Sequence, residues 1–140
     1  MKNMKTREEY ERLGKIILDC AFEVHKEIGP GHFESVYEEC LVMELRSRGI
    51  HVENQVYLPV YYKGKKLEKF FKMDIVVEKI IALELKSSTG LYPIDESQLV
   101  SYMKLANIKL GYLMNFNEVL LKNGLRRKYN NYYFHDEEKK

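Results

Sequence analysis

The sequence of 140 residues predicts a single α/β domain in which a mixed β-sheet is flanked by helices. Two observations support this prediction. Apolar residues recur every three to four positions in two N-terminal segments and in one central segment, and strand-length runs rich in apolar and aromatic residues fill the rest. The central helical segment separates two strands, as a parallel crossover requires. The expected order is α-α-β-β-β-α-β.

Two helices are expected in the N-terminal third. Residues 6–28 are predicted to form an amphipathic helix, and Gly29-Pro30-Gly31 interrupts it. Residues 33–48 are predicted to form the second helix, which ends where Gly49 can serve as a cap. The apolar stripe of the first helix comprises Leu13, Ile16, Ile17, Cys20, Ala21, Val24 and Ile28.

Three strands are expected in the middle of the chain. Residues 50–62 read as a strand that Pro59 places at an edge or a bulge, and Lys63-Gly64-Lys65 reads as the hairpin turn after it. Residues 69–77 and 80–87 are the next two predicted strands, joined tightly at Glu78-Lys79.

A helix at residues 94–106 and a last central strand at 109–116 complete the predicted core. A small hairpin or extended arm that turns at Asn123-Gly124 is expected to follow. Residues 1–130 are therefore predicted to form one domain, and residues 131–140 a flexible C-terminal tail.

The composition restricts the function classes. A net charge of +2 provides no overall positive field, so any nucleic-acid role must depend on a local patch. No apolar run approaches the roughly 20 residues of a membrane span, so no membrane association is expected. Cys20 and Cys40 are expected to be reduced thiols, and the cytoplasm is the expected compartment.

Three charged residues interrupt apolar runs in the segment MDIVVEKIIALELK, residues 73–86. Charged side chains are rarely buried unless they are paired or bound to something. Asp74, Glu84 and Lys86 therefore either neutralise one another or hold a cation. Because side chains alternate along a strand, Glu84 and Lys86 share a face.

The connection between the second and third strands decides whether Asp74 joins them. A two-residue turn would pair Asp74 with Leu83 and place Asp74 and Glu84 on opposite faces. A common site requires an odd-length connection or a bulge. Two adjacent carboxylates would raise each other's pKa unless they bound a cation such as Mg²⁺, which prefers oxygen ligands. The alternative is a Glu–Lys pair on a solvated sheet edge with an unrelated aspartate.

Several sequence elements occur together in a characteristic order: GHFESVY at residues 31–37, Asp74, ELK at 84–86, QLVSY at 98–102 and LGYLMNF at 110–116. In this combination the chain resembles the GxxExxY family of the PD-(D/E)XK nuclease-like superfamily, from Leu13 to Arg127. The resemblance implies a restriction-endonuclease-like core. Met73 stands where the superfamily motif has its proline.

The resemblance also implies roles for individual residues. Asp74, Glu84 and Glu34 would bind Mg²⁺ or Mn²⁺, and Lys86 would be the catalytic lysine. Gln98 and Tyr102, one turn apart on a helix, would position the substrate. Glu34 could instead be a first-turn acid that the helix dipole favours, and Gln98 and Tyr102 could simply line a cleft. Glu38 is expected to be solvated.

A basic cluster near the C-terminus offers a second candidate surface. Lys122, Arg126, Arg127 and Lys128 lie beside Tyr129, Tyr132 and Tyr133. Such a segment could follow a phosphate backbone and stack on bases, with Arg126 and Arg127 as substrate-binding residues. A solvated terminal arm is the alternative.

These observations favour a metal-dependent nuclease that hydrolyses phosphodiester bonds, with DNA as the expected substrate. The alternative function is a non-catalytic module that binds nucleic acid or a protein partner and retains the nuclease fold. A third interpretation is a purely structural carboxylate cluster. A homodimer is expected, because a domain this small often pairs to contact duplex DNA.

Overall fold

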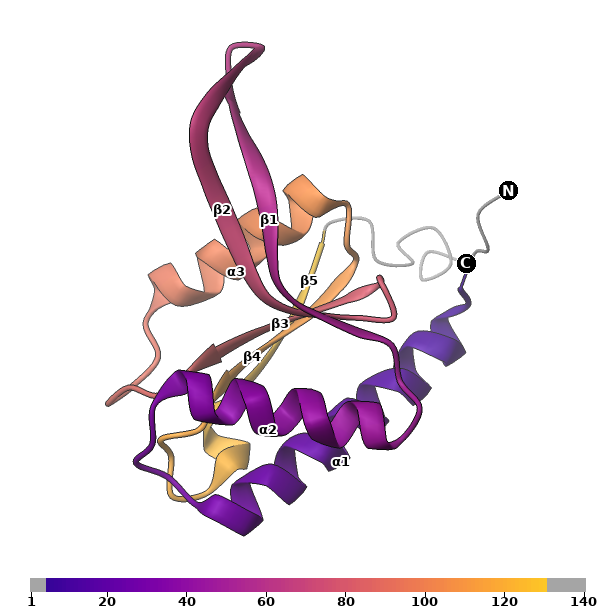
Figure 1. The fold of residues 1–140 in the computed structure, drawn as a ribbon, viewed down its shortest axis with the longest axis vertical. Coiled ribbons are helices and arrows are strands. Elements are labelled where there is room, and N and C mark those ends of the chain that lie inside the picture. The colour runs from indigo at the N-terminus through magenta and orange to yellow at the C-terminus, as the bar shows by residue number, and fades with distance from the viewer. Residues whose placement is uncertain (1–4, 131–140) are drawn as a thin grey trace.

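The computed structural model describes residues 5–130, which form five strands, three α-helices and one 3₁₀-helix. The predicted tail at 131–140 lies outside these residues. The elements are α1 (Arg7–Ile28), α2 (Glu34–Ser47), β1 (Val52–Tyr62), β2 (Lys65–Val77), β3 (Ile81–Lys86), α3 (Pro93–Ala106), β4 (Leu110–Asn115), η1 (Leu121–Gly124) and β5 (Leu125–Tyr129) (Figure 1).

The five strands form one mixed sheet in the order β1-β2-β3-β4-β5. Strands β3 and β4 are parallel and α3 connects them, whereas every other neighbouring pair is antiparallel. The predicted α/β class, the mixed sheet and the single crossover are therefore confirmed. The segment predicted as a hairpin or extended arm is the short helix η1 followed by β5, which pairs with β4.

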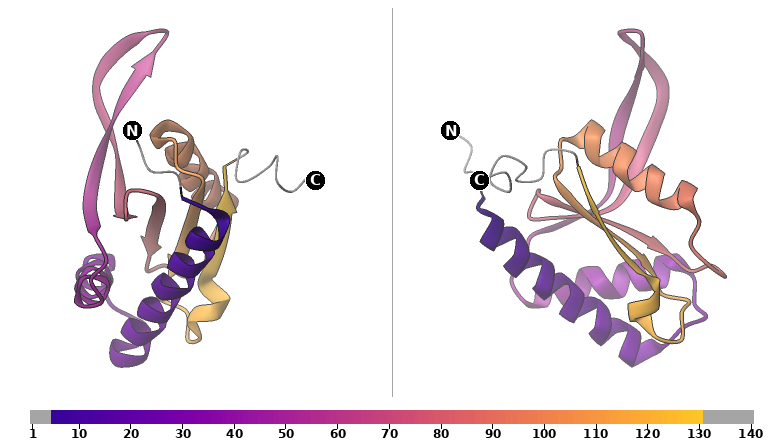
Figure 2. Two further views of the ribbon diagram at one scale, coloured as in Figure 1. Left: turned by 90° about the vertical axis from the view of Figure 1, so that its right-hand side faces the viewer. Right: turned by 180° about the vertical axis from the view of Figure 1, so that it is seen from behind.

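Helices cover both faces of the sheet, so the chain has two apolar cores (Figure 2). Helices α1 and α2 cover one face, where Tyr37 stacks on Phe116 with ring centroids 4.6 Å apart. Helix α3 covers the other face through Leu99 and Met103. No helix within residues 5–130 is long and apolar enough to cross a membrane.

Strands β1 and β2 form a long hairpin that projects beyond the rest of the molecule (Figure 1). Strand β2 begins at Lys65, four residues before its predicted start, and residues 61–70 are all exposed. The strand register shifts between Pro59 and Tyr61, and β1 is an edge strand. The prediction that Pro59 marks an edge or a bulge is therefore confirmed.

The hairpin changes face at its base. Met73 packs in the core beneath α3, whereas Ile75 and Val77 pack in the core beneath α1 and α2. A regular strand would place Met73, Ile75 and Val77 on one face, so the alternation of side chains is broken here. The cause lies in the partner strand, where Gln55 has a left-handed backbone (φ +54°) and interrupts the pairing opposite Asp74.

Gly111 in β4 allows α3 to pack closely on the sheet. A Cβ atom at this position would lie 2.7 Å from Met103 Sδ, 3.3 Å from Leu99 Cδ1 and 3.2 Å from the carbonyl oxygen of Ala82. The backbone of β4 at Gly111 is thus in contact with side chains of α3 and with the backbone of β3. The core has no space for an additional methyl group at this position.

We predict that Gly111→Ala lowers the free energy of unfolding by about 1–3 kcal/mol, because the methyl group overpacks this core. Urea denaturation monitored by circular dichroism measures the change. Gly90→Ala is the matched control, because its Cβ would meet nothing within 4 Å, and it should change stability by less than about 0.5 kcal/mol. Equal effects of the two substitutions would contradict the packing argument.

Candidate metal and catalytic site

The connection between β2 and β3 brings Asp74 and Glu84 together. It contains three residues, Glu78, Lys79 and Ile80, because Val77 pairs with Ile81. Glu78 and Lys79 have left-handed backbones, with φ of +51° and +63°. The predicted tight join at Glu78-Lys79 is thus one residue longer than a two-residue turn. The resulting register pairs Ile75 with Leu83, so the next positions along, Asp74 and Glu84, lie opposite each other.

The two carboxylates bond to the backbone where the regular pairing of β2 and β3 ends. The Leu85 N–H donates to Asp74 Oδ2 at 2.8 Å, and the Asp74 N–H donates to Glu84 Oε1 at 3.3 Å. Each carboxylate thus satisfies a backbone donor of the other strand. Asp74 Oδ1 and Glu84 Oε2 accept no hydrogen bond from residues 5–130.

Burial raises the pKa of both carboxyl groups. The pKa of Asp74 rises to about 6, mainly through desolvation, with a further increase from the negative charges of Glu38 and Glu34. The pKa of Glu84, whose side chain is almost wholly buried, rises to about 8, through desolvation first and the charge of Asp74 second. The fold therefore places two carboxylates together without enough positive charge to keep both ionised at neutral pH.

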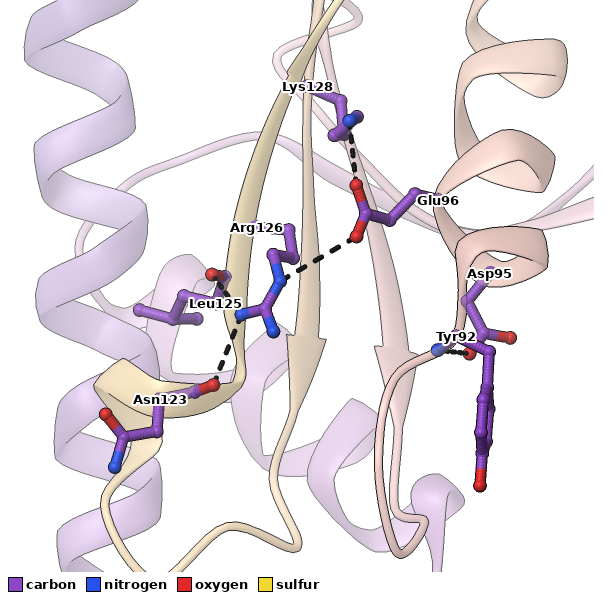
Figure 3. Close-up of polar contacts among 7 residues, drawn as sticks. All are labelled: Tyr92, Asp95, Glu96, Asn123, Leu125, Arg126 and Lys128. Atoms are coloured by element: carbon purple, nitrogen blue, oxygen red, sulfur yellow. Dashed lines mark hydrogen bonds and ion pairs between the residues drawn. The ribbon is translucent and has the colours of Figure 1, made fainter.

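Lys86 provides a positive charge near the two carboxylates, and it forms an ion pair with a residue of helix α3. Its Nζ lies 3.7 Å from Asp95 Oδ1, and its charge lowers the pKa of both Asp74 and Glu84. Asp95 Oδ2 also accepts the backbone N–H of Tyr92 at 2.9 Å, at the start of α3 (Figure 3). Asp95 therefore takes part in the capping box of α3. The structure adds a contact with Lys86 that periodicity alone does not reveal.

Glu34 lies apart from the carboxylate pair. It is exposed in the first turn of α2, and it raises the pKa values of Asp74 and Glu84 through its charge without a hydrogen bond to either. Within residues 5–130, no three His, Cys, Asp or Glu side chains lie close enough together to hold a metal ion. The predicted ligand set of Asp74, Glu84 and Glu34 is therefore not assembled in this structure.

Glu38, one turn after Glu34, is not the solvated residue that was expected. Its carboxylate accepts hydrogen bonds from Asn54 Nδ2 at 3.0 Å and from Gln55 Nε2 at 2.7 and 2.9 Å. The negative charge of Glu38 also raises the pKa of Asp74, and its effect is larger than the effect of the charge of Glu34. The spacing of four from Glu34 places both on one helix face, which was the available signal.

Helix α3 contributes Tyr102 to the site. Its ring stacks on Phe71 of β2 at 5.3 Å between centroids, and its pKa is raised by burial and by the charges of Glu84 and Asp74. Gln98 lies one turn earlier on α3 and is exposed. The structure thus brings Tyr102 near the carboxylates, and a contact of Gln98 with substrate stays a prediction.

The predicted basic cluster is divided between the two faces of β5. Arg126 and Lys128 lie on the α3 side, where both pair with Glu96, at 3.7 and 2.8 Å (Figure 3). Arg127 pairs with Glu11 of α1 on the other side. The basic residues of this segment therefore lie on two surfaces, because adjacent strand residues point in opposite directions. Substrate binding by Arg126 and Arg127 stays a prediction, and β4 separates their strand from β3.

Comparison with known proteins identifies the family. A family model described as the PD-(D/E)XK nuclease superfamily matches residues 11–128, from the second turn of α1 to near the end of β5. The chain belongs to the PD-(D/E)XK nuclease superfamily. No curated protein and no solved structure matches the chain. That Asp74, Glu84 and Lys86 are the acidic and basic residues for which the superfamily is named stays a prediction.

PD-(D/E)XK nucleases generally use divalent metal ions, and the donor set here fits such an ion in part. Asp74 Oδ1 and Glu84 Oε2 are carboxylate oxygens, the ligand type that Mg²⁺ and Mn²⁺ prefer. A divalent cation would also offset the mutual repulsion that raises the pKa of Glu84. Asp74 and Glu84 are thus the residues that would hold the ion, and water or substrate would provide the other ligands.

We predict that the protein without metal loses stability as pH rises from about 5 to 9. The pKa values of Asp74 and Glu84 are higher in the folded protein than in the unfolded chain, so the folded state binds more protons. The stabilisation is complete below pH 4 and is lost as pH rises through about 6 and then about 8.

Urea unfolding in EDTA across this pH range tests the prediction. Glu84→Gln, which keeps the shape of the side chain and cannot ionise, should remove most of the decline above pH 7. If the wild type and Glu84→Gln decline in parallel, Glu84 does not carry the effect.

Proposed function

We propose that this chain is a metal-dependent nuclease that hydrolyses phosphodiester bonds in DNA, and that it belongs to the GxxExxY family within its superfamily. One observation carries the proposal: Asp74 and Glu84 lie opposite each other on neighbouring strands, and Lys86 lies at the same end of β3. The charge of Lys86 only partly offsets the repulsion between the two carboxylates. The GHFESVY segment supports the family assignment. The two free cysteines support a cytoplasmic location, and the small size of the domain is the reason to expect a homodimer.

The proposed roles follow from the positions of the side chains. A Mg²⁺ or Mn²⁺ ion on Asp74 and Glu84 would activate water and neutralise phosphate charge. Lys86, held by Asp95, would orient the attacking water or stabilise negative charge on the scissile phosphate. The exposed Gln98 and the half-buried Tyr102, one turn apart on α3, would orient the substrate strand. Glu34 would contribute to the metal site through a water molecule.

A second candidate function is a nucleic-acid-binding module without catalytic activity. The observation that favours it is the missing third metal ligand within residues 5–130. Superfamily membership does not exclude it, because a fold can persist after activity is lost. The retained Asp74, Glu84 and Lys86 argue for the nuclease, because a module that only binds has no requirement for all three.

Cleavage assays distinguish the two functions. We predict that labelled single-stranded or duplex DNA is cut in Mg²⁺ or Mn²⁺ and not in EDTA. Asp74→Asn and Lys86→Ala should each lower the rate by about 100-fold or more, because they remove a metal ligand and the positive charge beside it. Lys15→Ala on α1 is the control and should cut at the wild-type rate. Equal cutting by all four proteins would indicate a contaminating nuclease.

Asp95 is predicted to be a positioning residue for Lys86. Asp95→Asn should retain the hydrogen bond from Tyr92 and lose the ionic attraction to Lys86. We expect kcat to fall by roughly 10- to 100-fold with little change in KM. In a Lys86→Ala background the same substitution should have no further effect, because the group that it positions is absent. Additive losses in the double variant would contradict this role.

A further inference from the structure

The β1–β2 hairpin carries an unusual set of exposed side chains. Tyr57, Tyr61, Tyr62 and Phe70 are each between 59% and 63% exposed, although aromatic side chains of this size normally bury most of their surface. All four lie within one projecting hairpin (Figure 1), whereas the other exposed aromatic residues, among them Phe33 and Tyr92, lie on separate elements. An exposed apolar surface of this kind in a folded protein indicates a binding surface.

The same hairpin carries a positive charge that exceeds that of the whole chain. Residues 57–72 contain five lysines and one glutamate, a net charge of +4, whereas the complete chain has +2 and the remainder therefore −2. Lys65, Lys66, Lys69 and Lys72 form no ion pair within residues 5–130, and Lys63 lies over the ring of Tyr62 at 5.4 Å. By contrast, Arg126, Arg127 and Lys128 on β5 are paired with acids.

Strand register places aromatic and basic residues on one face of the hairpin. Tyr57 lies opposite Lys72, Pro59 opposite Phe70 and Tyr61 opposite Lys66, and residues directly opposite each other share a face. Tyr57 and Phe70 are also in edge contact, with centroids 5.8 Å apart. The other face, with Leu58 and Phe71, turns toward α3. The face away from α3 therefore carries three aromatic rings, those of Tyr57, Tyr61 and Phe70, beside the ammonium groups of Lys66 and Lys72.

We propose that the β1–β2 hairpin binds an unpaired nucleic-acid strand and delivers it to the carboxylate pair. Lysines would contact the phosphates, and Tyr57, Tyr61 and Phe70 would stack on the bases. The delivery of the strand for cleavage rests on the proposed nuclease function. The binding of the strand by the hairpin needs neither metal nor catalysis. It names the substrate class as single-stranded nucleic acid or a single-stranded segment beside a duplex.

The composition of the hairpin favours an unpaired strand over a duplex groove. Residues 57–72 contain no Arg, Asn or Gln, the planar side chains that make bidentate contacts with base edges in the major groove, and Lys is their one residue type that can contact guanine there. The aromatic rings can stack only on bases that are already exposed. A second copy of the chain is a less favourable occupant, because two hairpins that each carry a net charge of +4 repel each other.

The route from hairpin to site is short. Lys72 precedes Asp74 by two residues on β2, which is about 7 Å along an extended strand. Glu38 of α2 bonds to Asn54 and Gln55 at the base of the hairpin, and this fixes where the hairpin leaves the sheet. The base of the hairpin therefore adjoins Asp74, the first residue of the carboxylate pair.

Fluorescence anisotropy in EDTA tests the proposal with a labelled 20-nucleotide thymidine oligomer and a 20-base-pair duplex. We expect the wild type to bind the oligomer more tightly than the duplex. Tyr57→Ala/Tyr61→Ala should weaken oligomer binding about tenfold or more. Lys66→Ala/Lys72→Ala, which removes the two ammonium groups on the same face as Tyr57 and Tyr61, should reduce the slope of log K against log salt by about 1.4.

The controls carry equal numbers of changes elsewhere. Phe22→Ala/Met43→Ala removes exposed apolar side chains from α1 and α2, and Lys15→Ala/Lys26→Ala removes the same charge from α1. Both should bind the oligomer as the wild type does. Thermal unfolding checks that the four variants are folded, as expected for exposed positions.

Three outcomes would overturn the proposal: no binding of the oligomer, duplex preference that the tyrosine variant does not affect, or a dimer in light scattering that only the hairpin variants disrupt. The nuclease assignment is tested separately by cleavage with Lys86→Ala. If this variant binds the oligomer normally and the wild type binds but never cuts, the proposed function fails and the hairpin proposal stands.

Discussion

The site depends on one constraint, the register between β2 and β3. The three-residue connection from Glu78 to Ile80 determines that Asp74 lies opposite Glu84, and each carboxylate then accepts a hydrogen bond from the backbone of the other strand. A connection one residue shorter would turn Asp74 to the opposite face. Strand β3 is the central strand of the sheet, and its side chains contribute to the cores on both faces. The register between β2 and β3 therefore affects the packing on both sides of the sheet.

The constraint has an energetic cost that other contacts offset. Two partly buried carboxylates repel each other, and desolvation adds to the penalty. The backbone hydrogen bonds from Leu85 and Asp74 and the charge of Lys86 recover part of it. The cores formed by residues such as Ile75 and Leu83 supply the remaining stability. A site that is unfavourable by itself and stable only within its fold is common in proteins that bind cations or substrates.

Local patterns in the sequence predicted much of the fold and part of the site. Alternation placed Glu84 and Lys86 on one face, and the crossover predicted the parallel strand pair. The length of the turn was not predictable, because Glu78 and Lys79 are not residue types that mark left-handed backbone. The change of face between Met73 and Ile75 was not predictable for the same reason, because Gln55, which has a left-handed backbone in the partner strand, is not a residue type that marks one. The acids that pair with the basic segment, Glu96 and Glu11, are distant in sequence, so no local signal connects them to it.

The contact between Glu38 and Gln55 has a thermodynamic consequence. The carboxylate of Glu38 fixes the hairpin base and is also the strongest of the neighbouring charges that raise the pKa of Asp74. Any shift of the hairpin that draws Glu38 away from Asp74 lowers that pKa and releases a proton. Linkage is reciprocal. Where ligand binding shifts the hairpin in this way, it lowers the proton affinity of Asp74, and protonation of Asp74 in turn weakens binding of that ligand.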